Sequence, residues 1–174
     1  ATTLELLARA AKAVDYAHRH NIVHRDIKPA NIMYDPNTDE LKLTDFGIAR
    51  MMDVSRTRTG IVLGTPSYMS PEQLEGENVN GNTDLFSLGV SLYQLLTGHL
   101  PFRGTSMTEL MFAIANEPHI PVTKIRQDLP SCLNVVLDKA LAKRPADRYE
   151  SGIEMANAFR DAARQASDLA VVSI

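Results

Sequence analysis

Cysteine and tryptophan are nearly missing from this chain of 174 residues, which contains one cysteine, Cys132, and no tryptophan. A single cysteine excludes an internal disulfide bond and any metal site that is built from several cysteines. No apolar run approaches the roughly 18 residues that a membrane-spanning helix requires. Positive charge is not in excess either, since the formal net charge is −3 at pH 7, so the charge indicates no nucleic-acid partner.

The overall composition is that of a globular domain. Hydrophobic residues make up 44% of the chain and charged residues 22%, and both fractions are close to the averages for globular proteins. Collagen-like, low-complexity and disordered classes are therefore excluded. The length corresponds to one domain that can bury a core of its own. We expect this domain to cover residues 1–167, with residues 168–174 as a tail or linker.

Helical signals dominate the pattern of apolar residues. A capping-box spacing between Thr2 and Glu5 precedes a one-sided apolar face, which predicts a helix from there to about His20. The segment 82–97 is apolar on nearly all sides and predicts a buried helix that ends at Gly98. Three further helices are predicted where a capping residue or a proline precedes apolar periodicity, after Ser106, Pro130 and Ser151.

Two other parts of the chain carry no helical signal. Residues 31–34 and 41–44 are short β-compatible runs on either side of the turn-forming stretch 35–39, so we expect a small hairpin. Residues 48–70 are rich in Arg, Thr, Ser and Gly and lack periodicity, and a loop of this length inside a compact domain is usually functional. The expected architecture is a helical body with one hairpin and one long loop.

Three clusters of polar residues flank the hairpin and the loop. Residues 24–31 read His-Arg-Asp-Ile-Lys-Pro-Ala-Asn, residues 45–47 read Asp-Phe-Gly, and residues 64–72 read Gly-Thr-Pro-Ser-Tyr-Met-Ser-Pro-Glu. Any one of these strings is weak evidence by itself. Together, in this order, they are specific.

The residue types of the first two clusters suit phosphoryl transfer, which needs a positioned hydroxyl, an acceptor for its proton and neutralised phosphate charge. Asp26 can orient the hydroxyl or accept its proton, and Lys28 can reach the transferring phosphate as a point charge. Asn31 and Asp45 offer an amide oxygen and a carboxylate, which are suitable ligands for Mg²⁺.

With these clusters in this order and spacing, the chain resembles the eukaryotic-type serine/threonine protein kinases. The string Tyr-Met-Ser-Pro-Glu-Gln at residues 68–73 is most similar to their bacterial branch. The resemblance runs from about Leu4 to about Gln165. It implies an α+β protein-kinase-like fold in which this chain is the mainly α-helical C-terminal lobe, with a small β-hairpin and a long activation loop.

For the chemistry, the resemblance implies that Asp26 is the catalytic base, assisted by Lys28, and that Asn31 and Asp45 are the metal ligands. The implied cofactors are ATP and Mg²⁺, with Mn²⁺ as an alternative to magnesium. Lys28, Asn31, Met33 and Asp45 are the implied nucleotide-binding residues. Met33 would lie on the floor under the adenine, and its alternative is an ordinary core methionine of the hairpin.

Five other residues are implied to be structural. His24 and Phe46 would pack against each other in the internal spine, and neither is expected to act as an acid or base. Glu72 would pair with Arg148 and so fix the end of the substrate loop. Asp84 would brace the backbone of the catalytic loop, although a carboxylate at a helix start could equally be an N-terminal cap.

The long loop is implied to hold the substrate and the regulatory sites. Thr65 would lie near Asp26 in the substrate-binding stretch. Thr57 and Thr59 are the expected regulatory phosphorylation sites, with Arg25 as the phosphate anchor, because a phosphate can order a loop by pairing with arginine. The alternative is a solvated polar loop in which these threonines have no role.

The family also carries a Gly-rich loop, a strand lysine and a helix glutamate in an N-terminal lobe, and this sequence contains none of them. We therefore expect the chain to be inactive alone and to transfer the ATP γ-phosphate to Ser/Thr hydroxyls of proteins when joined to that lobe. The expected partners are protein substrates and the missing N-terminal lobe. Self-association, or a swap of the activation segment, is a further expectation. The implied location is cytoplasmic, with any membrane anchor outside this chain.

Rival functions leave different signatures. A small-molecule phosphotransferase would share the catalytic and metal aspartates but would lack the threonine-rich loop and the cluster at 64–72. A pseudokinase scaffold, which is the alternative reading, would be expected to have lost Asp26, Asn31 or Asp45, and all three are present. A DNA-binding function has only a few loop arginines in its favour, against a negative net charge.

Overall fold

A computed structural model describes residues 2–46, 66–77 and 79–172, with side chains described up to residue 166. Its helices and strands, in chain order, are α1 (Thr3–Arg19), β1 (Ile32–Asp35), β2 (Glu40–Leu43), α3 (Pro71–Glu75), α4 (Gly81–Thr97), α5 (Met107–Asn116), α6 (Val122–Ile125), α7 (Cys132–Ala140) and α8 (Gly152–Val172). Single 3-10 turns cover Pro29–Asn31, Pro66–Tyr68 and Pro145–Asp147. The described part is therefore mainly helical with one small hairpin, which confirms the expected fold class.

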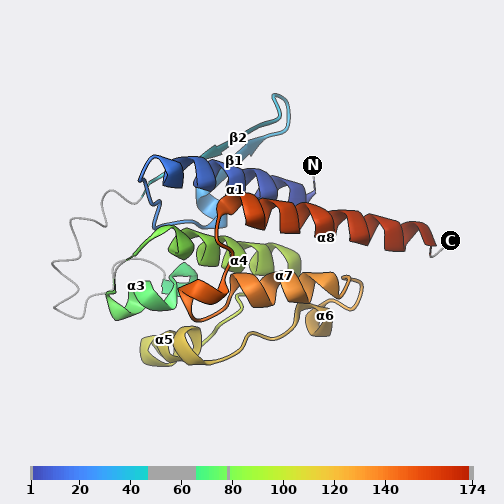
Figure 1. Ribbon diagram of the computed structural model, residues 1–174. Coiled ribbons are helices and arrows are strands. Elements are labelled where there is room, and N and C mark those ends of the chain that lie inside the picture. Colours follow the sequence, from blue (N-terminus) through green and yellow to red (C-terminus); the bar gives the residue numbers. More distant parts are fainter. Residues whose placement is uncertain (1, 47–65, 78, 173–174) are drawn as a thin grey trace.

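Helices α1 and α8 lie side by side and run in opposite directions (Figure 1). Near one end of the pair, Arg160 of α8 donates to Glu5 of α1 at 3.0 Å. Near the other end, the backbone N–H of Ile153 donates to the Asp15 carboxylate at 3.2 Å. The backbones approach closely where Gly152 starts α8, since a Cβ atom there would lie 2.2 Å from the carbonyl oxygen of Ala11.

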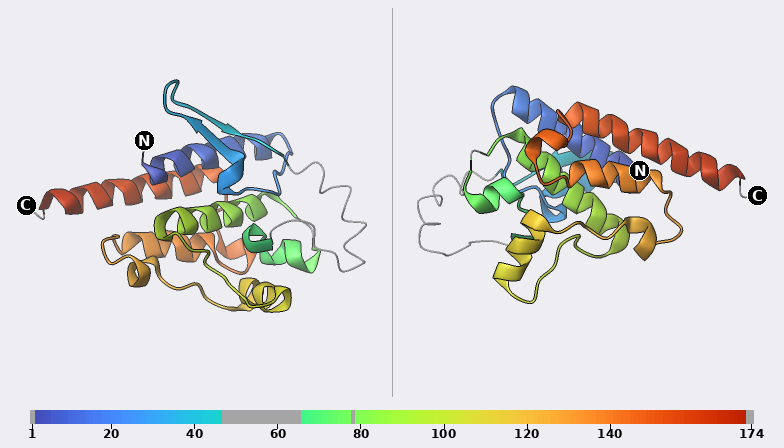
Figure 2. Two further views of the ribbon diagram at one scale, coloured as in Figure 1. Left: turned by 180° about the vertical axis from the view of Figure 1, so that it is seen from behind. Right: turned by 60° about the horizontal axis from the view of Figure 1, so that its bottom comes forward.

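Helix α4 runs through the centre of the molecule, with α1, α8 and the hairpin on one side and α7, α5 and α6 on the other (Figures 1 and 2). Every residue from Thr83 to Tyr93 is buried. This burial agrees with the expectation from its apolar sequence. It also means that each polar side chain on this stretch must find a hydrogen-bond partner inside the protein.

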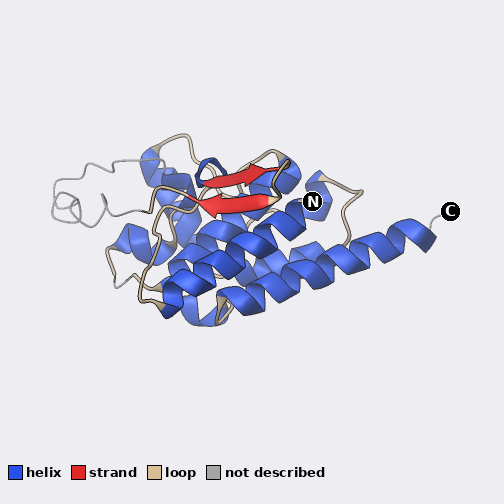
Figure 3. Ribbon diagram, turned by 90° about the horizontal axis from the view of Figure 1, so that it is seen from above, coloured by secondary structure: helices blue, strands red, loops and turns tan. Residues whose placement is uncertain are grey.

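Strands β1 and β2 pair antiparallel with Ile32 opposite Leu43, and they lie over the helices when the molecule is seen from above (Figure 3). A polar contact ties the hairpin turn to α1, because Arg9 pairs with the Asp39 carboxylate at 2.7 Å. The Tyr34 hydroxyl donates to the same carboxylate at 3.1 Å. These two contacts hold the turn of the hairpin close to α1.

Two short helices differ from the sequence expectations. Helices α3 and α6 were not expected, because segments of five and four residues are too short to show helical periodicity. Helix α8 continues to Val172, beyond the expected domain end at residue 167, and that boundary remains a prediction. None of the described helices combines the length and the apolarity needed to cross a membrane.

The close crossing of α1 and α8 gives a first prediction. Gly152→Ala should destabilise the fold by about 1–3 kcal/mol, because the new methyl group overlaps the Ala11 carbonyl and cannot be accommodated without moving a helix. Urea unfolding of the two proteins measures the difference. Asn157→Ala, at an exposed position of the same helix, is the matched control and should change stability little. Equal stability of Gly152→Ala and the parent protein would contradict the close approach.

Candidate active site

The loop between α1 and β1 brings Lys28 and Asn31 to one carboxylate oxygen of Asp26. Lys28 Nζ and Asn31 Nδ2 both donate to Asp26 Oδ2, at 3.0 and 3.2 Å. Asn31 Nδ2 also donates to the backbone carbonyl of Asp26 at 2.8 Å. The 3-10 turn Pro29–Asn31 positions Asn31 for these contacts. The Asp26 carboxylate is therefore held in a fixed direction by two neighbours on its own loop.

Two residues of the site have a left-handed backbone, which side chains other than glycine rarely adopt. Arg25, directly before Asp26, has φ 66°, and Asp45, two residues after the end of β2, has φ 55°. Such conformations persist only where the surrounding structure imposes them, and they concentrate at functional sites. No pattern in the sequence indicates them, because neither position is a glycine or an asparagine.

The buried carboxylate of Asp84 holds the backbone on the N-terminal side of the catalytic loop. Its two oxygens accept hydrogen bonds from the backbone N–H groups of His24 and Arg25, both at 2.8 Å. Asp84 is 1% exposed, so these bonds are needed to offset the cost of burying its charge. The brace implied by the resemblance is thus present. The alternative role as helix cap is wrong, because the N-cap of α4 is Asn80.

A third donor to Asp84 was not predicted from the sequence. His18 Nε2 lies 2.8 Å from Asp84 Oδ2. The ring fits there because the residue it covers is Gly81, where a Cβ atom would lie 2.6 Å from His18 Nδ1. His18 precedes Asp84 by 66 positions, so no local spacing could have revealed the contact.

His24 and Phe46 are in contact, with ring centroids 4.4 Å apart. The His24 ring is also fixed by hydrogen bonds, since Nε2 donates to the Thr44 carbonyl at 2.9 Å and Nδ1 accepts from the Asp26 N–H at 3.3 Å. The expected packing of these two rings is therefore present. The ring links the catalytic loop to the end of β2.

The two candidate metal ligands lie on backbone segments that are bonded to each other. The N–H of Thr44 donates to the carbonyl of Asn31 at 3.0 Å, and Asp45 is the next residue. Asn31 uses its Nδ2 toward Asp26, so its amide oxygen is not taken up by those bonds. Asp45 is exposed.

This donor set fits a magnesium ion, which is commonly held by one or two protein oxygens and by phosphate oxygens. It does not fit a site made by protein alone. Among residues 2–46, 66–77 and 79–172, no group of three His, Cys, Asp or Glu side chains is placed to bind a metal.

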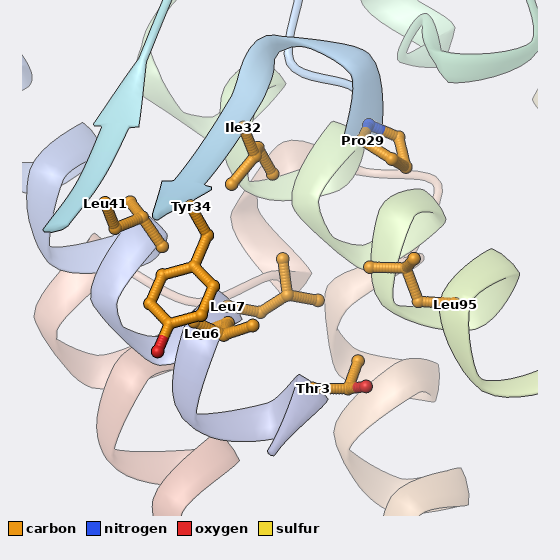
Figure 4. Close-up of a pocket in the computed structure, with 8 residues that line it drawn as sticks. All are labelled: Thr3, Leu6, Leu7, Pro29, Ile32, Tyr34, Leu41 and Leu95. Carbon is orange, nitrogen blue, oxygen red and sulfur yellow. The ribbon is translucent and has the colours of Figure 1, made fainter. Parts of the chain in front are cut away.

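Met33 lies on the outer face of the hairpin and is 57% exposed. Its alternative role as a core methionine is therefore wrong. The opposite face, which carries Ile32 and Tyr34, lines an apolar pocket of about 200 Å³ above α1 (Figure 4). The remaining lining residues are Thr3, Leu6, Leu7, Pro29, Leu41 and Leu95.

Glu72 and Arg148 form the predicted pair. Arg148 Nη1 and Nη2 donate to the two Glu72 oxygens at 2.7 and 2.8 Å, and both side chains are buried. The other N–H groups of the guanidinium donate to the backbone carbonyls of Asn82, Ala142 and Lys143. Burial would raise the pKa of Glu72, but the hydrogen bonds and charge of Arg148 outweigh it and hold that pKa below its ordinary value.

The remaining predicted residues lie outside the described part of the chain. These are Gly47 of the Asp-Phe-Gly motif, the expected phosphorylation sites Thr57 and Thr59, and Thr65 of the substrate stretch. Their predicted roles remain predictions.

The sequence matches the protein kinase domain family over residues 2–159. It is 43% identical over 155 residues to the serine/threonine-protein kinase PknB of Mycolicibacterium smegmatis. It is 42% identical over 150 residues to the probable serine/threonine-protein kinase CPE1738 of Clostridium perfringens. These alignments cover 87% and 84% of this chain but 25% and 22% of the two relatives. The chain thus spans about a quarter of the length of these curated relatives.

The fold is also similar to solved structures. It matches the kinase domain of Mycobacterium tuberculosis PknI with a TM-score of 0.68 and 31% sequence identity, over 91% of this chain and 53% of that one. It matches Rad53 in complex with AMP-PNP with a TM-score of 0.70 and 28% identity, over 88% of this chain and 38% of that one.

The buried ion pair gives a second prediction. Glu72→Gln should lower the free energy of unfolding by about 3–5 kcal/mol, because it leaves the Arg148 charge buried without a counter-charge. The matched control is Glu154→Gln, which breaks the half-exposed pair with Lys139 and should cost less than about 1 kcal/mol. Denaturant unfolding at neutral pH compares the two.

The same pair predicts a pH dependence. The pKa of Glu72 is lower in the folded than in the unfolded protein. The stability that Glu72 contributes is therefore fully present above the unfolded pKa, about 4.3, and is lost as the pH falls through the folded pKa. An equal loss of unfolding free energy in Glu72→Gln and Glu154→Gln would show that Glu72 is not the buried partner of Arg148.

The contact between His18 and Gly81 gives a third prediction. Gly81→Ala should destabilise the fold by about 1–3 kcal/mol, because its Cβ would displace the His18 ring from Asp84. In a His18→Ala background the ring is gone, so the same substitution should cost almost nothing. Thermal unfolding of the four proteins in this cycle measures the coupling. An equal cost in both backgrounds would show that the clash is not with His18.

Proposed function

Since the match extends over residues 2–159, this chain belongs to the protein kinase family, and we propose that it forms the C-terminal lobe of a serine/threonine protein kinase. The complete kinase would transfer the γ-phosphate of ATP to Ser or Thr hydroxyls of proteins. The match to about half of the PknI kinase domain supports the assignment to one lobe. The names of the bacterial relatives support the substrate class.

The single observation that carries the proposal is the convergence of Lys28 and Asn31 on the Asp26 carboxylate. An oriented carboxylate on a rigid loop can align a substrate hydroxyl and accept its proton, which is the role a protein side chain has in phosphoryl transfer. Lys28, next to this carboxylate, would place its positive charge against the transferring phosphate. The backbone on which Asp26 depends is held by Asp84 from the centre of the fold.

Asn31 and Asp45 would hold the divalent cation, for which magnesium is the first candidate and manganese the alternative. When bound, the cation neutralises negative charge on the phosphate oxygens. Asn31 would then have two functions, because its amide nitrogen orients Asp26 and its amide oxygen would bind the cation. Met33, exposed on the outer face of the hairpin, would contact the adenine. Rad53, a similar fold, was solved with the ATP analogue AMP-PNP.

The regulatory part of the proposal rests on sequence alone. Thr57 and Thr59 would accept phosphates that pair with Arg25, and Thr65 would lie beside the substrate hydroxyl. Arg25 itself is half-buried next to Asp26. A phosphate of charge about −1.5 to −2 near this arginine would bind the loop to the catalytic site.

The fourth prediction distinguishes the role of Asp26 from that of Asp45. In the full-length kinase that contains this chain, Asp26→Asn should lower kcat at least ~100-fold with little change in nucleotide affinity, because Asp26 acts on the hydroxyl. Asp45→Asn should weaken binding of the magnesium–nucleotide complex, because Asp45 is a metal ligand. Peptide phosphorylation kinetics and nucleotide titration measure the two effects.

Asp161→Asn, an exposed carboxylate of α8, is the matched control and should leave both quantities unchanged. Equal loss of nucleotide affinity in Asp26→Asn and Asp45→Asn would refute the division of roles. A full-length protein that binds the nucleotide but transfers no phosphate would favour the scaffold alternative.

A further inference from the structure

The backbone carbonyl of Arg25 is held from a second helix. Gln73 of α3 donates from Nε2 to this oxygen at 3.2 Å, across 48 positions of sequence. The N–H of Arg25 donates to the carboxylate of Asp84 on α4 at 2.8 Å. Arg25 therefore has one side of its peptide backbone bonded to α4 and the other to α3. This is the residue with φ 66° that directly precedes Asp26.

The Gln73 side chain is itself oriented by the helix on which it lies. Its Oε1 accepts from the N–H of Ser70 at 3.1 Å, and its own N–H donates to Ser70 Oγ at 3.4 Å, which together form a capping box. With Oε1 used for the cap, the amide group turns Nε2 toward Arg25. An amide is needed at this position, because an ionised carboxylate could form the cap but could not donate to the carbonyl.

Helix α3 is in turn fixed to the core. Glu72, the residue before Gln73, forms the buried pair with Arg148 and accepts a further hydrogen bond from Thr83 Oγ1 at 2.8 Å. Ser70 donates to the same threonine hydroxyl at 3.2 Å. Helix α3, which carries the Gln73 amide, therefore has a fixed position relative to α4.

From these contacts we propose that Gln73 is a positioning residue that acts through the Arg25 backbone to set the direction of Asp26. It couples the placement of α3, whose first two residues end the cluster at 64–72, to the alignment of the substrate hydroxyl. This inference rests on the proposed kinase function. It adds a residue whose side chain contacts neither nucleotide nor hydroxyl.

The test uses Gln73→Glu in the full-length kinase that contains this chain. A glutamate keeps the capping box and is favourable near a helix N-terminus, so the thermal midpoint should not fall. It removes the donor to Arg25, and loss of one neutral hydrogen bond corresponds to a fall in kcat of about 5- to 10-fold. The KM for ATP should stay the same, because the residues proposed to hold the nucleotide keep their contacts.

Two further variants separate positioning from charge and from helix stability. Gln73→Ala removes the Oε1 half of the capping box as well as the donor, so it should lower kcat as Gln73→Glu does and also lower the thermal midpoint. Gln127→Glu introduces the same charge at an exposed position and should change neither. A fall in kcat in Gln73→Ala alone would assign the effect to the helix cap, and a fall in Gln73→Glu alone would assign it to charge. Either result overturns the proposal.

A readout that does not need activity is the hydrogen exchange of the Arg25 and Asp26 amides, measured by NMR in the same proteins. Both amides should exchange about 5- to 10-fold faster in Gln73→Glu and Gln73→Ala than in the parent protein and in Gln127→Glu. Unchanged exchange would overturn the proposal even where kcat falls. Faster exchange in these two variants, combined with a parent protein that transfers no phosphate, would instead support the positioning contact and refute the kinase function.

Discussion

The buried carboxylate of Asp84 is the constraint on which the active-site loop depends. A charge that is 1% exposed must be matched by donors, and Asp84 finds them in the backbone of His24 and Arg25 and in the His18 ring. The loop cannot move away without leaving this charge unpaired. A residue in the core of the fold therefore decides where the loop before Asp26 lies, although it touches no reacting group.

A second buried carboxylate, Glu72, holds helix α3 in place in the same way. Its pairing with Arg148 fixes α3 to the start of α4 and to the turn that precedes α8. Thr83 and Asp84 are neighbours on α4, and each belongs to one of these two networks. The first turns of one buried helix thus serve as the common reference for the catalytic loop and for α3.

This arrangement explains how strained backbone can persist in the site. Arg25 and Asp45 both have a left-handed conformation, and each lies next to a residue whose backbone is bonded to another segment. The energy that this conformation costs is supplied by the surrounding fold and not by local sequence. The result is that Asp26, Asn31 and Asp45 come from two separate stretches of chain but are held to one framework.

Local patterns were enough to predict the long helices, the hairpin and the residue types of the site, because periodicity, caps and the strings at 24–31 and 45–47 are visible in the sequence. The sequence also contained one unused signal, the Ser70 to Gln73 capping spacing that marks α3. Three features became visible only in the folded protein: His18 and Gly81 adjoin Asp84, Gln73 contacts Arg25, and Met33 is exposed. These contacts join residues up to 66 positions apart and depend on where helices cross, which no local pattern encodes.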